Sequence, residues 1–235
     1  RNIFIITTLI SLLSYPIGSE TLSVDDLVIR NGLLFKKFSD TPFNGEVSGE
    51  NQTFKGITTG IVKNGKPEGK WVTFYKSGQL KNRSFFKDGK EEGKSEYFYE
   101  NGEMFKSITL VNGIKNGPEK FYFQNGKLDE IRNFKEGKRD GPWIRYYENG
   151  NIFGKGNYKD GRQHGLWEWY WENGKIDRLL QMKDGRYHGT FESYYETGKI
   201  RSRGTYENDS REGSFEYFNE DGSIDGDTGL YKDGV

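Results

Sequence analysis

The sequence contains no cysteine and no alanine. Without cysteine the chain has no disulfide staples, no thiol catalysis, no cysteine-ligated zinc and no lipidated cysteine anchor. Alanine is the best helix former, and its absence beside 32 Gly in 235 residues excludes a helical bundle. The formal net charge is zero, so the composition offers no electrostatic footprint for nucleic acid, although a local basic patch can hide in a neutral total.

Aromatic residues replace the missing aliphatic core. The chain has 17 Phe, 15 Tyr and 5 Trp, whereas Leu, Ile, Val and Phe together make up only about 23% of it. That share lies near the lower edge for folded proteins, but the balanced charge argues against a swollen, disordered chain. We therefore expect a folded protein whose core is largely aromatic.

The N-terminus carries a candidate targeting segment. Residues 3–17 are mostly apolar and follow Arg1, and the small residues Gly18 and Ser19 come next. The run covers only about 22 Å at helical rise, contains Pro16 and is too short for a transmembrane helix. It predicts a secretory signal peptide over residues 1–19, and hence export to the periplasm or the extracellular space if the source is bacterial.

An internal repeat of 24 residues organises the rest of the chain. We count places within a unit from its first glycine, and further glycines recur at place 10 and place 21. This predicts eight units over residues 45–235. The first glycines are Gly45, Gly69, Gly93, Gly117, Gly141, Gly165, Gly189 and Gly213.

Turn signals lie at two places in each unit. Asn149-Gly150 represents the first set and Asp160-Gly161 the second, and both dipeptides favour two-residue type I′ hairpin turns. Each unit is then one antiparallel hairpin, and the chain is an all-β, elongated hairpin array. Counting outward pairs Tyr147 with Ile152, Trp143 with Gly156, and Gly154 with Trp167, so places 3, 7, 12 and 18 share one face, the core.

Place 6 falls on the opposite face and is aromatic in each of the last seven units. A row of this kind spans roughly 60 Å at the spacing of hairpin strands. Exposed aromatic rows of this length are typical of interaction surfaces, so we take the row as the candidate partner-binding surface. Its members are Phe74, Phe98, Tyr122, Tyr146, Tyr170, Tyr194 and Phe218.

Both ends of the array are predicted to be capped. Residues 20–44 contain two apolar runs around Asn31-Gly32, which predicts a capping hairpin at residues 26–37. At the other end Asp221, Asp225 and Asp227 make the last unit polar. These carboxylates favour a charged cap, with a calcium site as the alternative, although the spacing matches neither an EF-hand nor a β-roll.

Other candidate chemistry is sparse. His164 and His188 occupy equivalent places in neighbouring units, roughly 9 to 10 Å apart, which is too far for a shared zinc and favours polar turn residues. Trp167, Trp169 and Trp171 alternate along one strand, so we expect all three on the core face; a sugar-binding platform is the alternative. No catalytic or phosphate-binding motif occurs, and we predict no enzyme activity, no cofactor and no metal.

The segments GPWIRYYENGNI and YKDGRQHG resemble the variant MORN repeat found in many bacterial proteins, and the resemblance covers about residues 45–235. It implies a rod of antiparallel hairpins with aromatics along one side, and an interaction module rather than a catalyst. Some bacterial relatives are labelled antitoxin-like, and some eukaryotic ones associate with membranes. The departures are Ser95 and Glu119 in place of the place-3 aromatic, an altered turn at Asp209 and Ser210, and an extra residue in the last unit.

From these patterns we expect an exported, non-enzymatic repeat protein that serves as a scaffold for protein–protein interaction. The alternatives are a surface that binds cell-envelope glycans through its aromatic rings and a surface that binds lipid. The balanced charge disfavours the lipid alternative.

Overall fold

The computed structural model describes residues 20–51, 56–226 and 228–232; the predicted signal peptide lies outside these ranges. The described chain is almost entirely β-structure, with one 3₁₀ turn, η1 (Val24–Asp26). None of its helices has the length and apolarity to cross a membrane. The all-β prediction is confirmed.

Strands follow one another in short, regular steps. The N-terminal part contains β1 (Glu20–Leu22), β2 (Leu27–Arg30), β3 (Leu33–Lys36), β4 (Gly45–Asn51), β5 (Gly56–Lys63), β6 (Lys66–Phe74), β7 (Leu80–Lys87), β8 (Lys90–Glu91) and β9 (Gly93–Phe98). The middle contains β10 (Met104–Val111), β11 (Ile114–Tyr122), β12 (Leu128–Lys135), β13 (Lys138–Arg139), β14 (Gly141–Tyr146) and β15 (Ile152–Lys159). The C-terminal part contains β16 (Arg162–Tyr170), β17 (Ile176–Lys183), β18 (Arg186–Tyr194), β19 (Ile200–Glu207), β20 (Ser210–Tyr217) and β21 (Gly229–Tyr231).

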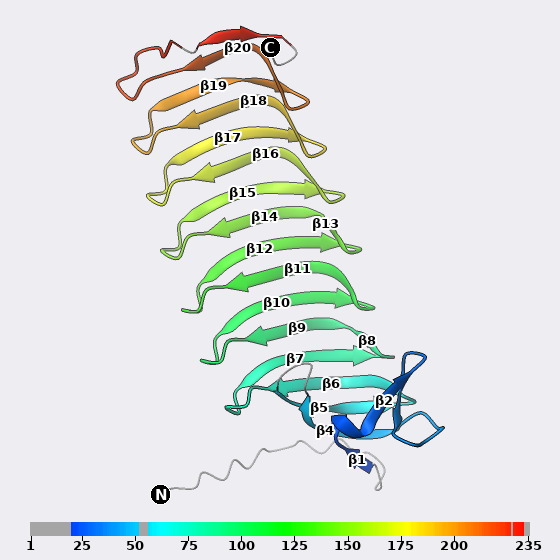
Figure 1. Ribbon diagram of the computed structural model, residues 1–235. Helices are drawn as coiled ribbons and strands as arrows, with labels where there is room; N and C mark the ends of the chain where they lie inside the picture. The colour runs from blue at the N-terminus through cyan, green and yellow to red at the C-terminus, as the bar shows by residue number, and fades with distance from the viewer. Residues whose placement is uncertain (1–19, 52–55, 227, 233–235) are drawn as a thin grey trace, which may run out of the picture.

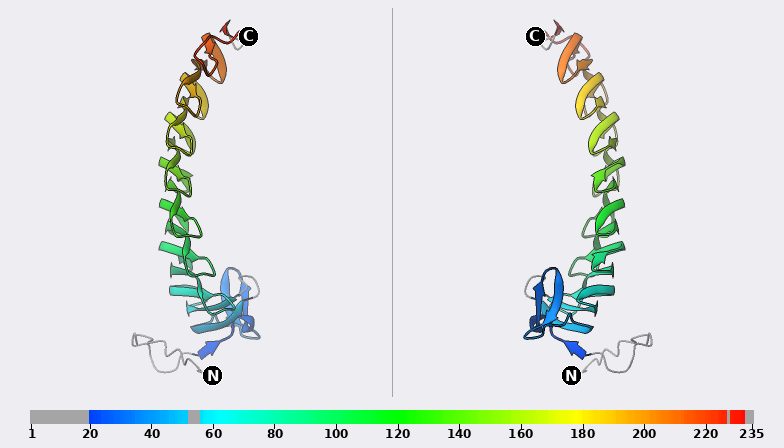
Figure 2. Two further views of the ribbon diagram at one scale, coloured as in Figure 1. Left: turned by 90° about the vertical axis from the view of Figure 1, so that its left-hand side faces the viewer. Right: turned by 90° about the vertical axis from the view of Figure 1, so that its right-hand side faces the viewer.

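One long sheet contains all of these strands except β2 and β3, which form a separate hairpin. The long strands pair antiparallel in chain order, β8 and β9 both pair with β7, β13 and β14 both pair with β12, and β1 adds to β4 in parallel. The strands stack like the rungs of a ladder (Figure 1). Viewed from the side, the sheet is one layer thick and bows into a crescent, and the β2–β3 hairpin lies on its hollow side (Figure 2).

The turns at places 20 and 21 have the predicted type I′ geometry. Asp160 and Gly161 both have positive φ, at 49° and 86°. The turn at Asn208 and Asp209 also keeps this geometry, with φ of 49° and 75°, although it lacks glycine. Asparagine and aspartate tolerate the left-handed region, and this tolerance preserves the hairpin there.

The turns at places 9 and 10 differ from the prediction. Only Gly150 has positive φ, at 98°, and its N–H donates to the Tyr147 carbonyl at 2.9 Å. The Asn149 side chain instead accepts a hydrogen bond from the N–H of Asn151 at 2.8 Å. The result is a longer turn that ends in a left-handed glycine, the other common hairpin type.

This longer turn changes the register beside it. Trp143 pairs with Gly156 as predicted, but a bulge follows, so that Tyr146 rather than Tyr147 pairs with Ile152. Place 12 therefore lies on the face opposite the core, and its assignment to the core was wrong. In the same way, Gly154 pairs with Trp169 instead of Trp167.

The second register change preserves the faces. It lies near Gly165, which has φ of 77°, between the pairs Asn157 with His164 and Lys155 with Glu168. The bulged strand gains two residues there, and two extra residues leave the side-chain alternation unchanged. Places 3 and 18 consequently remain on the core face.

The core lies on the hollow side of the sheet, which we call the inner face. Trp167 is 2% exposed and packs with Leu180 and Met182. Its ring stacks on Trp143 with centroids 5.2 Å apart. A Cβ at Gly156 would clash with the Trp167 indole, so a glycine at place 16 makes room for the aromatic ring of the following unit.

The predicted hairpin at residues 26–37 forms as β2 and β3, with Asn31 and Gly32 at φ of 50° and 77°. It attaches to the array through β3, because the N–H of Leu34 donates to the Gly65 carbonyl at 2.7 Å and its carbonyl accepts from Phe43 at 2.9 Å. Beneath it lies an apolar cluster of Leu22, Phe43, Val47 and Val62.

Candidate partner-binding surfaces

The seven predicted aromatics form a continuous row on the outer face, opposite the core. Each pairs across its hairpin with an aliphatic residue or Met at place 12, and each is half-buried. The pairs are Phe74 with Leu80, Phe98 with Met104, Tyr122 with Leu128, Tyr146 with Ile152, Tyr170 with Ile176, and Tyr194 with Ile200; Phe218 bridges to Ile224. We call this set of residues the outer stripe. The sequence predicted the aromatic residues of the stripe at place 6, but not its aliphatic residues at place 12.

The backbone of the outer stripe is anchored by the neighbouring place-7 side chains. Tyr147 donates its hydroxyl to the Tyr170 carbonyl at 2.8 Å, one unit further along. Trp171 does the same to Tyr194 through Nε1 at 3.3 Å. Phe123 occupies this place in its unit and has no hydroxyl to donate. These bonds tie each unit to the next beside the stripe.

Charged residues of both signs border the outer stripe. Lys155 pairs with Glu168 at 3.1 Å and lies over the Tyr170 ring, 5.6 Å from its centroid. Arg203 likewise pairs with Glu216 and covers Phe218 at 5.5 Å. An apolar centre with a mixed, paired polar rim is the usual anatomy of a protein interface.

Two tyrosine hydroxyls of the stripe are already hydrogen-bonded. Tyr170 donates to Glu168 at 2.5 Å, and Tyr194 donates to Glu192. Burial, helped by the Glu192 hydrogen bond, raises the pKa of Tyr194 to about 12. Both hydroxyls therefore stay protonated across the physiological pH range, and their hydrogen bonds to glutamate hold the rings in place.

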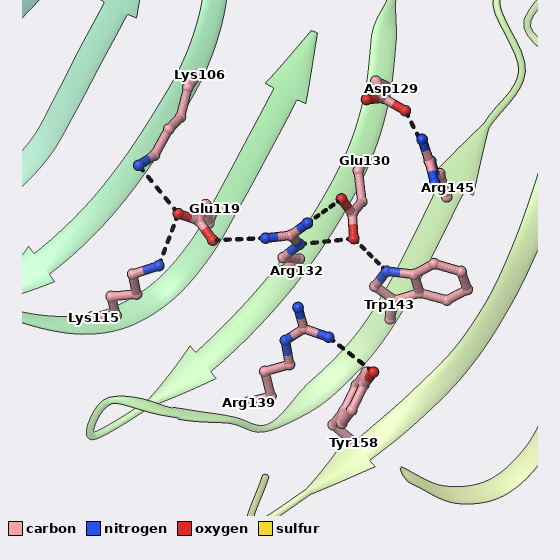
Figure 3. A network of polar contacts seen from close by, with 10 residues as sticks. All are labelled: Lys106, Lys115, Glu119, Asp129, Glu130, Arg132, Arg139, Trp143, Arg145 and Tyr158. Atoms are coloured by element: carbon pink, nitrogen blue, oxygen red, sulfur yellow. Dashed lines mark hydrogen bonds and ion pairs between the residues drawn. The ribbon is translucent and has the colours of Figure 1, made fainter. Parts of the chain in front are cut away.

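The inner face carries a polar network where the aromatic core is interrupted (Figure 3). Glu119, at place 3, is 1% exposed and contacts Lys115 at 2.9 Å and Lys106 at 3.4 Å. Arg132 lies 3.9 Å from Glu119 and binds Glu130 through two hydrogen bonds at 2.7 and 2.6 Å. The departure at Glu119 thus replaces ring packing by ion pairs.

Trp143 joins the end of this network. Its Nε1 donates to Glu130 at 2.6 Å. Burial alone raises the pKa of Glu130, but the hydrogen bonds from Arg132 and Trp143 outweigh it, so that the pKa lies below the usual glutamate value. The carboxylate is accordingly a fixed acceptor, and all of its partners are structural groups of this chain.

The other predicted sites are the two histidines and the acidic residues near the C-terminus. Within the described ranges no three His, Asp or Glu side chains are grouped to hold a metal ion. Asp221 accepts hydrogen bonds from Ser223, and Asp227 lies outside the described residues. His164 and His188 each have a buried Nδ1 with no hydrogen-bond partner in the described structure.

The three alternating tryptophans line the inner face as predicted. Trp167 is enclosed by Trp143 and Tyr158, and Arg178 covers the Trp169 ring at 4.8 Å from its centroid. These ring faces are occupied by the protein itself. Packing thus accounts for the cluster better than a sugar platform does.

A groove of about 730 Å³ lies between the N-terminal hairpin and the inner face, and the sequence did not reveal it. Trp71, Phe86 and Tyr97 line the array side. The sequence signal nearest to it is the departure at Ser95, a small buried side chain at a place where the neighbouring units carry Trp71 and Glu119. A volume of this size is typical of ligand-binding clefts.

Comparison with protein families identifies the repeat. The family model described as MORN repeat variant matches six consecutive segments that together make up more than half of the chain. They are residues 67–88, 91–112, 115–136, 139–160, 163–184 and 187–208. No curated protein matches the chain.

Proposed function

Because the chain belongs to the MORN repeat variant family, we propose that it is an exported, non-enzymatic scaffold that binds a protein partner along the outer stripe. The observation that carries this proposal is the half-buried apolar row on the outer face, which continues over seven units. The N-terminal hairpin covers only the inner face (Figure 2). Within the described residues, no second layer of strands lies over the outer face (Figure 2).

The chemistry of the stripe favours protein over glycan and lipid. Aromatic and aliphatic side chains alternate there, and the tyrosine hydroxyls that would bind sugar at Tyr170 and Tyr194 are engaged by glutamates. The bordering cations are paired with carboxylates, for example Lys155 with Glu168, so they provide no net positive field for an anionic membrane. Interface energy concentrates in aromatic anchors, which this row supplies.

Export is part of the same proposal and rests on the apolar segment at residues 3–17. A bacterial origin, with a place among the antitoxin-like members of the family, rests on the repeat consensus alone. Export is tested by expressing the chain with a C-terminal tag in a bacterial host, separating periplasm from cytoplasm, and reading the new N-terminus. Retention in the cytoplasm with an intact segment would reject export.

The binding surface is tested with two double variants of the mature chain. Tyr146→Ser with Tyr170→Ser removes two half-buried stripe rings and should keep the fold, because neither ring belongs to the buried cluster of the inner face. Tyr147→Ser with Trp171→Ser removes two inter-unit hydrogen bonds and should cost several kcal/mol, as large core truncations do. Thermal unfolding of the variants measures this difference.

Binding is then measured with partners captured from envelope extract, identified by mass spectrometry and purified. Titration calorimetry should show that the folded Tyr146/Tyr170 variant loses affinity by more than about tenfold. Tyr187→Ser, which removes an exposed ring outside the stripe, is the matched control and should bind normally. A folded stripe variant with unchanged affinity would overturn the proposal.

A further inference from the structure

The groove beneath the N-terminal hairpin has two unlike walls. On one side, Leu27 and Ile29 of β2 and Leu34 of β3 face into it. On the other, aromatic side chains of the array line it, among them Trp71 and Tyr97. Ile29 is 74% exposed although it lines this apolar groove, so the groove is open along β2.

The backbone of β2 presents an unpaired edge to this opening. In the β2–β3 hairpin, Ile29 lies opposite Leu34. Leu34 directs its N–H and carbonyl away from β2, toward Gly65 and Phe43. Antiparallel geometry then directs the N–H and carbonyl of Ile29 away from β3, and within the described chain β2 pairs with no strand but β3. Such an edge is a template for an added strand.

The groove floor contains a polar group without a partner. Ser84 is buried, lines the groove, and its hydroxyl makes no hydrogen bond within the described structure. An acyl chain has no donor or acceptor to offer this hydroxyl or the outward N–H and carbonyl of Ile29. A polypeptide can supply backbone donors and acceptors together with apolar side chains.

We propose that the groove binds an extended segment of a partner polypeptide, which adds to β2 as a strand and inserts alternate apolar side chains between β2 and the array. Main-chain bonds to Ile29 supply affinity, and the pocket at Trp71, Phe86 and Tyr97 selects the side chains. The site is separate from the outer stripe, since it lies on the inner face. The rival occupant is the β2 strand of a second copy of this chain. This occupant is disfavoured, because Leu27 and Ile29 of that copy already face the groove of their own molecule.

The probe is a phage-displayed library of ten-residue peptides, selected on the mature chain and followed by synthesis of the enriched sequences. We expect enriched peptides to alternate apolar and polar residues. Ile29→Ala should weaken their binding by removing one wall. Ile29→Pro removes the outward N–H as well, without touching a β2–β3 bond, and should weaken binding about tenfold further than alanine.

Controls separate this site from the stripe and from non-specific stickiness. Leu230→Ala removes a similarly exposed aliphatic side chain at the far end of the array, outside the outer stripe, and should leave peptide binding unchanged. The Tyr146/Tyr170 double variant should also bind the peptide normally, so failure of the stripe proposal leaves this one intact. Hydrogen exchange should show the Ile29 amide protected only when peptide is present.

Several results would overturn the proposal. The first two are that no peptide is enriched, or that the peptide binds equally to the wild type and to Ile29→Pro. The third is that sodium oleate displaces the peptide and binds more tightly. The fourth is that the chain forms a dimer in which the Ile29 amide is protected without peptide. If the proline variant fails to fold, N-methylated peptides replace it. Methylation of one alternate set of amides should then abolish binding and methylation of the other set should not.

Discussion

Two stretches of the inner face have the same hairpin backbone, but aromatic side chains pack in one and ion pairs form in the other. In the unit that begins at Gly165, Trp167 pairs with Leu180 and is packed among rings. In the unit that begins at Gly117, the equivalent pair is Glu119 with Arg132, surrounded by lysines. Both place-3 side chains are almost completely buried. The hairpin backbone therefore tolerates either an aromatic or an ionic layer.

The residue eleven positions earlier, at place 16 of the preceding unit, differs between the two stretches. Gly156 precedes Trp167, and the indole occupies the space that a Cβ would fill. Gly60 and Gly204 stand in the same relation to Trp71 and Phe215. Before Glu119 this place is Ile108, which is itself buried. Glycine at this place thus lets a ring lie directly against the preceding strand, whereas Trp143 and Phe191, which follow Arg132 and Leu180, are only half-buried.

The largest effect is expected from Arg132→Met. This variant leaves the buried carboxylates of Glu119 and Glu130 without their shared guanidinium, and breaking a buried ion pair costs about 3 kcal/mol or more. Urea unfolding at neutral pH measures the loss. If the variant has the same free energy of unfolding as the wild type, the ion pairs of Arg132 do not stabilise the array.

The matched control is Arg203→Met, which breaks the exposed pair with Glu216 and should leave stability nearly unchanged. Acid provides a second readout. Because the pKa of Glu130 is lowered in the folded state, its stabilisation is present above the usual glutamate pKa and is lost as pH falls through the lowered value. The wild type should therefore lose more stability in acid than the Arg132 variant does.

A smaller loss is expected from Gly156→Ala. The added methyl group would clash with Trp167, and overpacking of this kind costs about 1 to 3 kcal/mol. Gly226→Ala, which meets no atom within 4 Å, should be nearly neutral. In a Trp167→Leu background the Gly156 substitution should cost less, as a double-mutant cycle would show. Equal costs in both backgrounds would contradict the proposed coupling.

The smallest effect is a gain from Phe123→Tyr. Its neighbours Tyr99 and Tyr147 donate to carbonyls of the following unit at 3.1 and 2.8 Å, and the new hydroxyl should reach the Tyr146 carbonyl in the same way. One such bond adds about 0.5 to 1 kcal/mol. Tyr147→Phe is the reciprocal control and should lose a similar amount in thermal unfolding. If neither variant changes the melting temperature, these hydrogen bonds do not stabilise the array.

Much of the architecture could be predicted from local chemistry. The 24-residue glycine spacing and the Asp160-Gly161 type of turn predicted hairpins, and the structure has them. Place 12 was assigned to the wrong face, because Asn149-Gly150 suits two turn types with different bulges. Which turn forms depends on the hydrogen bonds among Tyr147, Gly150 and Asn151, and a dipeptide preference alone does not choose between this set and that of a two-residue turn.

The candidate surfaces divide in the same way. The sequence by itself determined the repeat, the aromatic row of the outer stripe and the Trp167 layer, because side-chain alternation and turn preference act between residues close in the chain. The tertiary structure alone decided that Glu119 finds cations and that a groove opens beneath β2. Those outcomes depend on which strands lie side by side and where the N-terminal hairpin attaches, at Gly65 and Phe43. Such contacts join segments that no local pattern relates.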